Sequence, residues 1–339
     1  MQKSRVLVTV TEDYPVDIQT VNEVLSEIAD IHTVALPHRV LTAEEESDLI
    51  EEMKDVIALF VRPGIITERT INAAKKLRII AVHGAGVDQI DVKAATKKGI
   101  FVTNVPGGNA EAVAELTMGL MLSLVRRIPF AVKQVREKGQ WGEARFLGTE
   151  LRGKTLGIIG LGYVGTAVAK IARGFDMKIL YYKRKRKPEL EKILDIEYKD
   201  LNTLLQESDF ISIHVPLTDE TYHMLSEQQF KLMRKTAFLV NTSRGKVVDE
   251  AALYKALKEN RIAGAALDVL EKEPPTSSNP LLQQHNVVIT PHMAGSTREC
   301  LQTIAKTAAE DIAAVLRGEL PKNLVNVEAL RMKQASLGR

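Results

Sequence analysis

Three glycines spaced G-x-G-x-x-G constrain this chain most: Gly160, Gly162 and Gly165. They follow an apolar run at residues 155–159 and precede an apolar helical pattern at residues 167–172. In a strand–turn–helix unit, the first glycine allows the tight turn and the second lets the backbone approach a pyrophosphate. The third glycine lets the helix pack closely on the strand. The segment therefore predicts a dinucleotide-binding turn at a helix N-terminus, where free N–H groups attract anions. The other candidate binding residues in the turn are Leu161, Tyr163 and Val164.

Short apolar runs alternate with amphipathic segments along most of the chain. Most of these runs are continuous, as in parallel strands that are buried on both faces. The expected strands are Val6–Val10, Val56–Val61, Ile79–Val82, Thr155–Gly160, Lys178–Tyr182, Phe210–Val215, Ala237–Asn241, Ala263–Leu267 and Val287–Thr290. The expected helices include Ala110–Leu124, Val164–Arg173, Glu250–Asn260 and Thr297–Leu316. This rhythm predicts an α/β fold with parallel sheets.

Length and two Pro/Gly turns indicate the division into domains. A chain of 339 residues exceeds one ordinary core. The turns lie at residues 103–108 and 290–295, each before a long helical pattern. We expect a substrate domain made of residues 1–104 and 293–339, with a Rossmann domain at residues 105–292 inserted in it.

Composition excludes several classes of protein. The content of 45% hydrophobic and 26% charged residues is ordinary for a globular chain, and no apolar run reaches membrane-spanning length. The N-terminus does not resemble a secretory signal. The single cysteine, Cys300, forms no internal disulfide, so a cytoplasmic location is expected. A net charge of +3 is too small for a nucleic-acid-binding protein, and no histidine has metal-ligand spacing, so no metal site is expected.

Five consecutive basic residues, 183–187, follow the second strand of the predicted dinucleotide unit. An acidic residue at this strand end would bind the ribose hydroxyls of NAD and repel a 2′-phosphate. Basic side chains suit that phosphate, and the fork of Arg184 can bind it through two hydrogen bonds. The sequence therefore predicts NADP as the preferred cofactor, with NAD possible. The residues expected to contact it here are Lys183, Arg184 and Lys185; the alternative is a solvated basic loop.

Arg244, Glu273 and His292 each follow an apolar strand, where open α/β sheets bind ligands. An arginine can bind a carboxylate and polarise a carbonyl. A histidine can donate a proton near neutral pH, and a carboxylate beside it orients the ring. Together these groups suit hydride transfer to a 2-oxo acid, whereas each residue alone suits a structural role.

Several motifs in order resemble the D-isomer-specific 2-hydroxyacid dehydrogenase family, from about Val56 to Val325. They are His83–Asp88, Asn109–Leu116, Gly160–Gly165, Asn241–Asp249, Ala266–Pro274 and Pro291–His292. The resemblance implies flavodoxin-like and NAD(P)-binding Rossmann-like domains with a cleft between them, and a homodimer. It makes Arg244, Glu273 and His292 the catalytic residues, with His292 the proton donor. It also implies that Asp268, Thr242 and Ser243 bind the cofactor and that the substrate carboxylate is held by Gly84, Ala85 and Gly86.

Within the family, the basic strand end resembles glyoxylate and hydroxypyruvate reductases. Arg62 and the segment 109–115 also resemble D-3-phosphoglycerate dehydrogenases, which makes that activity an alternative. Arg62 is a candidate for binding a second polar group of the substrate, and His83 is a candidate specificity residue. A third hypothesis is a nucleotide-sensing corepressor-like scaffold, because the family contains corepressors that keep these residues. No nucleic-acid or membrane partner is expected.

Overall fold

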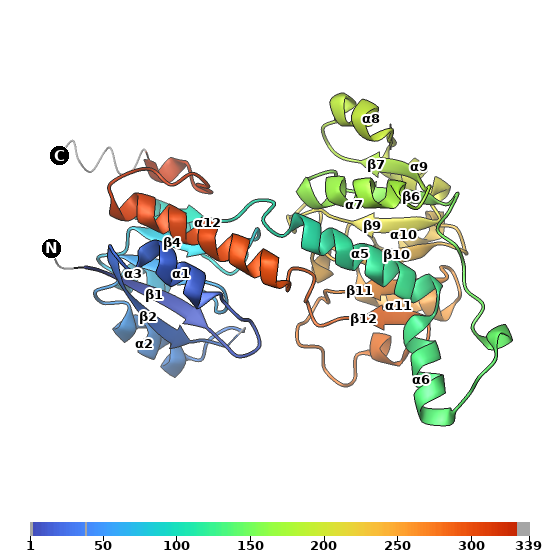
Figure 1. The fold of residues 1–339 in the computed structure, drawn as a ribbon, viewed down its shortest axis with the longest axis horizontal. Coiled ribbons are helices and arrows are strands. Elements are labelled where there is room, and N and C mark those ends of the chain that lie inside the picture. Colours follow the sequence, from blue (N-terminus) through green and yellow to red (C-terminus); the bar gives the residue numbers. More distant parts are fainter. Residues whose placement is uncertain (1–2, 38, 331–339) are drawn as a thin grey trace. The chain divides into compact units, whose positions relative to one another are not determined.

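A computed structural model describes residues 3–37 and 39–330, apart from the side chain of Arg145. The chain divides into two units (Figure 1). Unit 1 comprises Met1–Asn109 and Thr297–Arg339, of which residues 331–339 lie outside the described part, and unit 2 comprises Ala110–Ser296. The sequence predicts the corresponding boundaries at 104/105 and 292/293. Among the described helices, none combines the length and apolarity that a membrane crossing needs.

Unit 1 is a five-stranded parallel sheet with the order β2-β1-β3-β4-β5. Its strand order is that of the flavodoxin-like doubly wound fold, which the resemblance implies. Its strands are β1 (Ser4–Val10), β2 (Ala29–Ala35), β3 (Ala58–Val61), β4 (Ile79–Val82) and β5 (Phe101–Thr103). Its helices are α1 (Ile18–Leu25), α2 (Ala43–Glu52), α3 (Glu68–Ala73), α4 (Val92–Lys97) and α12 (Arg298–Leu316).

The C-terminal part of the chain completes unit 1. Helix α12 packs on α1, β4 and β3. After it, the buried Asn326 accepts a hydrogen bond from Val102 N at 2.8 Å and donates to the carbonyl of Ile100 at 2.9 Å. These bonds satisfy backbone groups beside β5, which a buried strand end requires. Residues 298–330 are therefore an integral part of unit 1.

Unit 2 is a seven-stranded parallel sheet with the order β12-β11-β10-β9-β6-β7-β8. Its strands are β6 (Thr155–Ile159), β7 (Lys178–Tyr182), β8 (Glu197–Tyr198), β9 (Phe210–Ile213), β10 (Phe238–Asn241), β11 (Gly264–Leu267) and β12 (Val287–Ile289). Its helices are α5 (Ala110–Val125), α6 (Ile128–Lys138), α7 (Tyr163–Arg173), α8 (Pro188–Leu194), α9 (Leu201–Glu207), α10 (Glu227–Leu232) and α11 (Glu250–Lys258). Short 3₁₀ turns are Glu143–Arg145, Gly245–Val247 and Pro280–Gln283.

Two apolar cores cover the two faces of this sheet. Successive strand residues point to opposite faces, so Ile158 packs in the core beneath α5 and α7, whereas Ile159 packs in the core beneath α9–α11. The strand order reverses between β6 and β9, and ligands of such sheets bind outside the carboxyl ends of the strands at this point.

All nine expected strands are present, and three more were not predicted: β2, β5 and β8. Strand β2 lies at a sheet edge and exposes much of its length, so its sequence lacks a continuous apolar run. Strands β5 and β8 have only three and two residues. The apolar pattern therefore identified every interior strand and the edge strand β12, and missed the other three edge strands.

Candidate active site

Three neighbouring strands bring the three predicted catalytic residues to one edge of unit 2. Arg244 follows β10, Glu273 lies in the loop after β11, and His292 follows β12. These strands are consecutive in the sheet, and all run parallel. Their carboxyl ends therefore lie at the same edge, which is the ligand-binding edge of this class of sheet.

A hydrogen bond joins His292 and Glu273. The Nδ1 atom of His292 lies 2.6 Å from Glu273 Oε2. Glu273 Oε1 accepts a hydrogen bond from Leu270 N at 2.8 Å, which fixes the carboxylate. A carboxylate on one ring nitrogen sets the tautomer and orients the other nitrogen, here Nε2, for proton transfer. Both side chains are partly exposed, so the pair is accessible to a ligand.

Asp268 holds the segment that carries His292. Its carboxylate is buried and accepts hydrogen bonds from Thr290 Oγ1 at 2.6 Å, Met293 N at 2.9 Å and Ala294 N at 2.9 Å. Burial raises the pKa of Asp268, and these hydrogen bonds oppose that rise. Its carbonyl also accepts from His292 N at 2.9 Å. The sequence predicted a cofactor contact for Asp268 and gave no indication of this anchoring by Thr290.

The Arg244 loop is fixed by its own neighbours. Arg244 Nη1 donates to the Ser243 carbonyl at 2.8 Å, and Asn241 Nδ2 donates to the Arg244 carbonyl at 3.0 Å. A Cβ atom on Gly245 would lie 1.9 Å from the carbonyl carbon of Leu270, so only glycine permits this approach to the loop that bears Glu273. Thr242 is buried, and its hydroxyl lies 2.9 Å from that of Thr117.

The glycine turn has the geometry that a pyrophosphate requires. Gly160 has φ +100°, and a Cβ there would lie 2.5 Å from the His214 carbonyl oxygen. A Cβ on Gly165 would lie 2.1 Å from the Gly160 oxygen, whereas one on Gly162 would meet no atom within 4 Å. Helix α7 begins after Gly162 without a side-chain cap, so its first N–H groups remain available for an anion. These features fit a dinucleotide cofactor.

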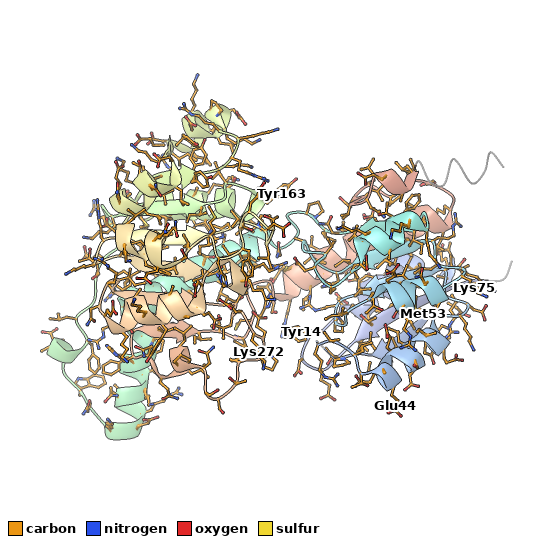
Figure 2. All side chains as sticks on the ribbon, turned by 180° about the vertical axis from the view of Figure 1, so that it is seen from behind. Tyr14, Glu44, Met53, Lys75, Tyr163 and Lys272 are labelled. Atoms are coloured by element: carbon orange, nitrogen blue, oxygen red, sulfur yellow. The ribbon has the colours of Figure 1, made fainter. Side chains whose placement is uncertain are left out.

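The side chains of the turn differ in exposure. Leu161 is buried, Val164 packs partly against the core, and Tyr163 projects from the start of α7 with 68% exposure (Figure 2). His214, directly after β9, is partly buried, and desolvation lowers its pKa to about 3. Tyr163 is therefore the side chain of this turn that a ligand can reach most easily.

The basic run after β7 is ordered by acidic partners. Lys183 Nζ donates to the Leu161 carbonyl of the glycine turn at 3.0 Å. Arg184 pairs with Glu220, and Arg186 pairs through two hydrogen bonds of 2.7 Å with Glu191. Lys185 is exposed and has no such partner among the described residues. The run therefore presents Lys183–Lys185 beside the turn.

Buried Tyr181 shapes the far end of this run. Its hydroxyl donates to Glu191 at 2.6 Å and accepts from Lys187 N at 2.8 Å. Burial and the hydrogen bond to Glu191 raise the pKa of Tyr181 to about 12. This end of the basic segment is therefore structured rather than a free loop.

In unit 1, the residues predicted to bind substrate follow β3 and β4. Arg62 follows β3, and its Nη1 atom lies 2.8 Å from His83 Nδ1. Gly84 has φ +154°, and the Ala85 carbonyl accepts from Asn104 Nδ2 at 2.5 Å. Within the described chain, neither the Ala85 N–H nor the Gly86 N–H donates a hydrogen bond. Consecutive free N–H groups of this kind bind anions.

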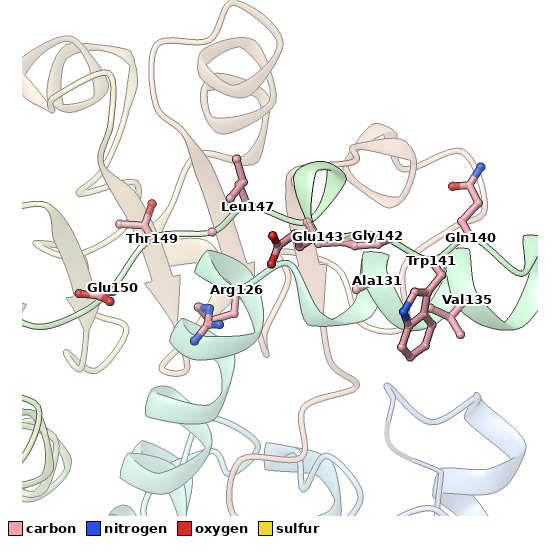
Figure 3. Close-up of a pocket in the computed structure, with 12 residues that line it drawn as sticks. Arg126, Ala131, Val135, Gln140, Trp141, Gly142, Glu143, Leu147, Thr149 and Glu150 are labelled. Atoms are coloured by element: carbon pink, nitrogen blue, oxygen red, sulfur yellow. The ribbon is translucent and has the colours of Figure 1, made fainter.

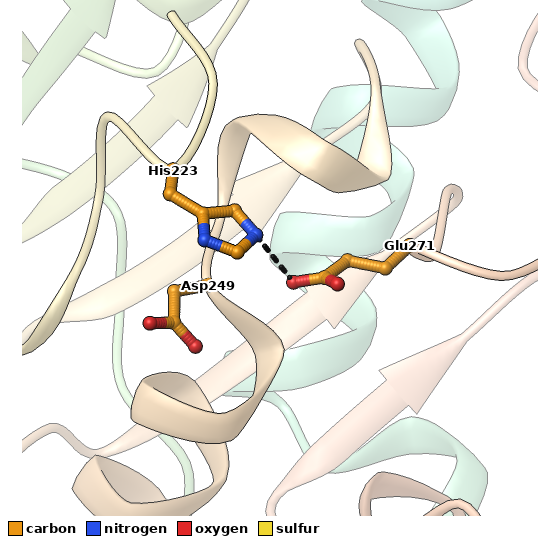
Figure 4. Close-up of side chains that lie close together, drawn as sticks. All are labelled: His223, Asp249 and Glu271. Carbon is orange, nitrogen blue, oxygen red and sulfur yellow. Dashed lines mark ion pairs between the residues drawn. The ribbon is translucent and has the colours of Figure 1, made fainter.

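His223, Asp249 and Glu271 lie close together in unit 2 (Figure 4). His223 Nε2 lies 3.0 Å from Glu271 Oε1, and their donor atoms are close enough to surround a metal ion. Both carboxylates already serve helix α11, because Asp249 accepts from Ala252 N and Glu271 accepts from Glu250 N. The cluster therefore fastens the loops beside α11.

The protein is similar to known enzymes over most of its length. Residues 118–294 match the model of the D-isomer specific 2-hydroxyacid dehydrogenase, NAD binding domain. A glyoxylate reductase from Korarchaeum cryptofilum is 49% identical over 291 residues, which cover 84% of this chain and 87% of that protein. A D-3-phosphoglycerate dehydrogenase from Methanocaldococcus jannaschii is 44% identical over 319 residues, covering 94% of this chain and 59% of that protein. The crystal structure of an Aquifex aeolicus D-lactate dehydrogenase, complexed with NAD and lactic acid, superposes with a TM-score of 0.81 and 32% identity, covering 95% and 99% of the two chains.

Proposed function

Since the chain belongs to the D-isomer specific 2-hydroxyacid dehydrogenase family, we propose that it reduces glyoxylate and hydroxypyruvate with NADPH. It is an NAD(P)-dependent oxidoreductase that acts on small 2-hydroxy and 2-oxo acids. The observation that carries the proposal is the His292–Glu273 pair, which lies at the ligand-binding edge of a sheet with a dinucleotide turn. Glyoxylate is the substrate in the name of the Korarchaeum relative.

The proposed mechanism assigns one task to each residue. The reduced nicotinamide, when bound, supplies a hydride to the carbonyl carbon of the substrate. Arg244 binds the substrate carboxylate and polarises the carbonyl, and His292 donates the proton to the developing alkoxide. Glu273 holds the ring through Nδ1 and stabilises its charged form. In unit 1, the N–H groups of Ala85 and Gly86 are assigned to carboxylate binding.

The preference for NADP rests on the basic run. Lys183, Arg184 and Lys185 follow β7 where an acidic residue would favour NAD. Arg184 is 75% exposed, so it can exchange Glu220 for a 2′-phosphate that offers more acceptor oxygens. Thr242, Ser243 and Asp268 lie at the carboxyl ends of β10 and β11 and are assigned to the rest of the cofactor. The expected domain roles follow: unit 2 binds the cofactor and unit 1 binds the substrate.

D-3-phosphoglycerate dehydrogenase activity is a second candidate, supported by Arg62. This guanidinium is partly buried, and none of the described carboxylates pairs with it. A buried cation without an acid partner suits an anionic ligand. The Methanocaldococcus relative carries that activity in its name. In this alternative, Arg62 would bind the phosphate.

A homodimer is proposed from the apolar surface beside helix α6. This helix buries none of its residues, Trp141 is 90% exposed and Leu147 is 75% exposed. Trp141 lies beside Val135 at a pocket of about 780 Å³ that is lined by 12 residues between Arg126 and Glu150 (Figure 3). This exposure excludes a core position for Trp141. Exposed apolar side chains of this kind suit a protein interface, and a second copy of unit 2 is the proposed occupant. A cytoplasmic location stays a prediction from Cys300.

Steady-state kinetics on a panel of 2-oxo acids, with NADH and NADPH in parallel, tests the function. We expect the highest kcat/KM for glyoxylate or hydroxypyruvate with NADPH. A higher kcat/KM for 3-phosphohydroxypyruvate would instead favour the phosphoglycerate alternative. If none of the acids is reduced while nucleotide still binds, the corepressor-like hypothesis becomes the better one.

A further inference from the structure

His292 has a backbone conformation that a histidine seldom adopts. Its φ is +51°, in the left-handed region, which is unfavourable for a residue with a Cβ atom. Such a conformation persists only where the surrounding contacts impose it. The hydrogen bonds of residues 290–294 must therefore supply what holds His292 in position.

Contacts with Asp268 impose this conformation. The N–H of His292 lies 2.9 Å from the Asp268 carbonyl oxygen and 3.0 Å from that of Thr290, and donates to both. The next two N–H groups, those of Met293 and Ala294, each donate to the Asp268 carboxylate at 2.9 Å. Consecutive N–H groups beside a left-handed residue form a concavity that binds an anion, and the anion here is the side chain of Asp268. The orientation of this carboxylate therefore decides where His292 lies.

The hydroxyl of Thr290 fixes that carboxylate. Thr290 Oγ1 donates to Asp268 Oδ1 at 2.6 Å, on the same oxygen that accepts from Met293 N. Asp268 is 1% exposed, so bulk water does not replace a hydrogen bond that is lost there. Burial raises the pKa of Asp268, and the bond from Thr290 is the largest contribution that lowers it. Thr290 therefore keeps the carboxylate charged and turned toward the two N–H groups.

We propose that Thr290 is a positioning residue for proton donation, which acts through the Asp268 carboxylate to hold the backbone of His292. The inference rests on the proposed function, in which Nε2 of His292 gives its proton to the developing alkoxide. Glu273 fixes the ring of His292 at Nδ1, whereas Thr290 fixes the segment that carries the ring. A displacement of a reacting group on the order of 1 Å can lower a rate about 100-fold, so both contacts contribute to kcat.

Thr290→Val removes the hydroxyl and keeps the shape of the side chain. We expect kcat to fall about tenfold or more, with the KM values for glyoxylate and NADPH within about threefold of wild type, because the groups that bind them stay in place. The ratio of kcat in H2O to kcat in D2O should rise, because proton donation becomes slower relative to the other steps. A merely structural role would leave this ratio unchanged. Thr290→Ser keeps the donor and should have a kcat within about threefold of wild type.

Thr203→Val is the matched control. Thr203 Oγ1 donates to Asp200 Oδ2, also at 2.6 Å, at the start of helix α9. This variant should keep kcat within about twofold of wild type. Equal losses of kcat in Thr203→Val and Thr290→Val, or a Thr290→Ser variant as slow as Thr290→Val, would overturn the proposal. If thermal unfolding shows that Thr290→Val does not fold, the comparison of Thr290→Ser with Thr290→Ala decides, since these two differ by one hydroxyl.

The double variant His292→Asn/Thr290→Val provides the decisive comparison. Asparagine tolerates the left-handed region but has no imidazolium proton to donate. If Thr290 acts through His292, the double variant should have the same kcat as His292→Asn alone, and a further tenfold fall, as for independent effects, would overturn the proposal. A wild-type kcat in His292→Asn would refute the proton donor of the proposed function. A wild-type kcat in Thr290→Val, with His292→Asn slow, would refute the role of Thr290 alone.

Discussion

The Nδ1 atom of His292 lies 2.6 Å from a carboxylate oxygen of Glu273, although 19 residues separate them in the chain. Two neighbouring strands, β11 and β12, bring them together. Since Nδ1 is engaged, Nε2 is the nitrogen that can serve a substrate. The geometry of the pair therefore makes Nε2 of His292 the atom that donates the proton.

Replacement of Glu273 tests this arrangement. Glu273→Gln keeps an acceptor for Leu270 N but removes the charge that stabilises the imidazolium. We expect kcat to fall about 10- to 100-fold, with a smaller change in KM. Glu271→Gln is the matched control, because Glu271 pairs with His223 instead and its amide oxygen can still accept from Glu250 N. Equal losses in the two variants would contradict the assignment.

Two glycine substitutions separate folding from cofactor binding. Gly162→Ala should change the free energy of unfolding by less than about 0.5 kcal/mol, because its Cβ meets no atom within 4 Å. It should still weaken NADPH binding about tenfold or more, because the Cβ occupies space that the pyrophosphate needs.

Gly160→Ala should lower the free energy of unfolding by more than about 1 kcal/mol, since φ is +100° and the carbonyl oxygen of His214 blocks the Cβ. Fluorescence titration and thermal unfolding measure the two effects; wild-type NADPH affinity in Gly162→Ala would refute the role of the turn.

Charge substitutions in the basic run test the cofactor preference. Arg184→Gln should lower kcat/KM for NADPH about tenfold or more and leave that for NADH within about twofold. Arg186→Gln is the control, since its guanidinium is held by Glu191. Glu220→Gln frees Arg184 and should lower the KM for NADPH by a few-fold at low salt. If the ratio of kcat/KM for NADPH to kcat/KM for NADH is unchanged in Arg184→Gln, the NADP proposal is left without support.

Two histidines with lowered pKa values, His83 and His214, make the protein sensitive to acid. Burial lowers the pKa of His214 to about 3, and burial with the Arg62 charge lowers that of His83 to about 3. Between this value and the ordinary pKa of about 6.5, the unfolded chain binds protons that the folded chain does not. Each group therefore removes stability as pH falls through this window, by up to about 1.4 kcal/mol per pH unit.

His214→Gln isolates one of these contributions. Glutamine can still reach Ser212, whose hydroxyl lies 2.8 Å from His214 Nε2. Denaturant unfolding at pH 7, 6, 5 and 4 should show a smaller loss of stability in the variant than in wild type. Parallel curves would contradict the lowered pKa of His214.

Polar substitutions beside α6 test the proposed dimer. The double variant Trp141→Ser/Leu147→Ser should sediment as a monomer at concentrations where wild type is a dimer, because it loses two exposed apolar side chains. Ile193→Ser is the control: Ile193 is 75% exposed on α8, outside the proposed interface. A monomeric wild type, or dissociation by the control alone, would contradict the interface.

Local patterns in the sequence were sufficient to predict the central strands and the glycine turn. The continuous apolar runs predict β4 and β7 at their observed bounds, since strands buried on both faces need apolar residues throughout. The polar edge strand β2 carries no such pattern. Residues that act through tertiary contacts were also missed, such as Thr290, which bonds Asp268, and Glu220, which pairs with Arg184. Nothing in the sequence around Glu220 indicates that partner.

The return of the chain to unit 1 has a consequence for biosynthesis. Unit 2 is one continuous segment, Ala110–Ser296, and all seven of its strands are synthesised before α12. Two contacts of unit 1 have to wait for this last part of the chain. Helix α1 packs on α12, and Val102 N donates a hydrogen bond to Asn326, so neither contact can form until synthesis has passed residue 326. Although domains usually mature in N-terminal order during translation, the inserted domain of this protein is expected to reach its native state first, and the N-terminal one last.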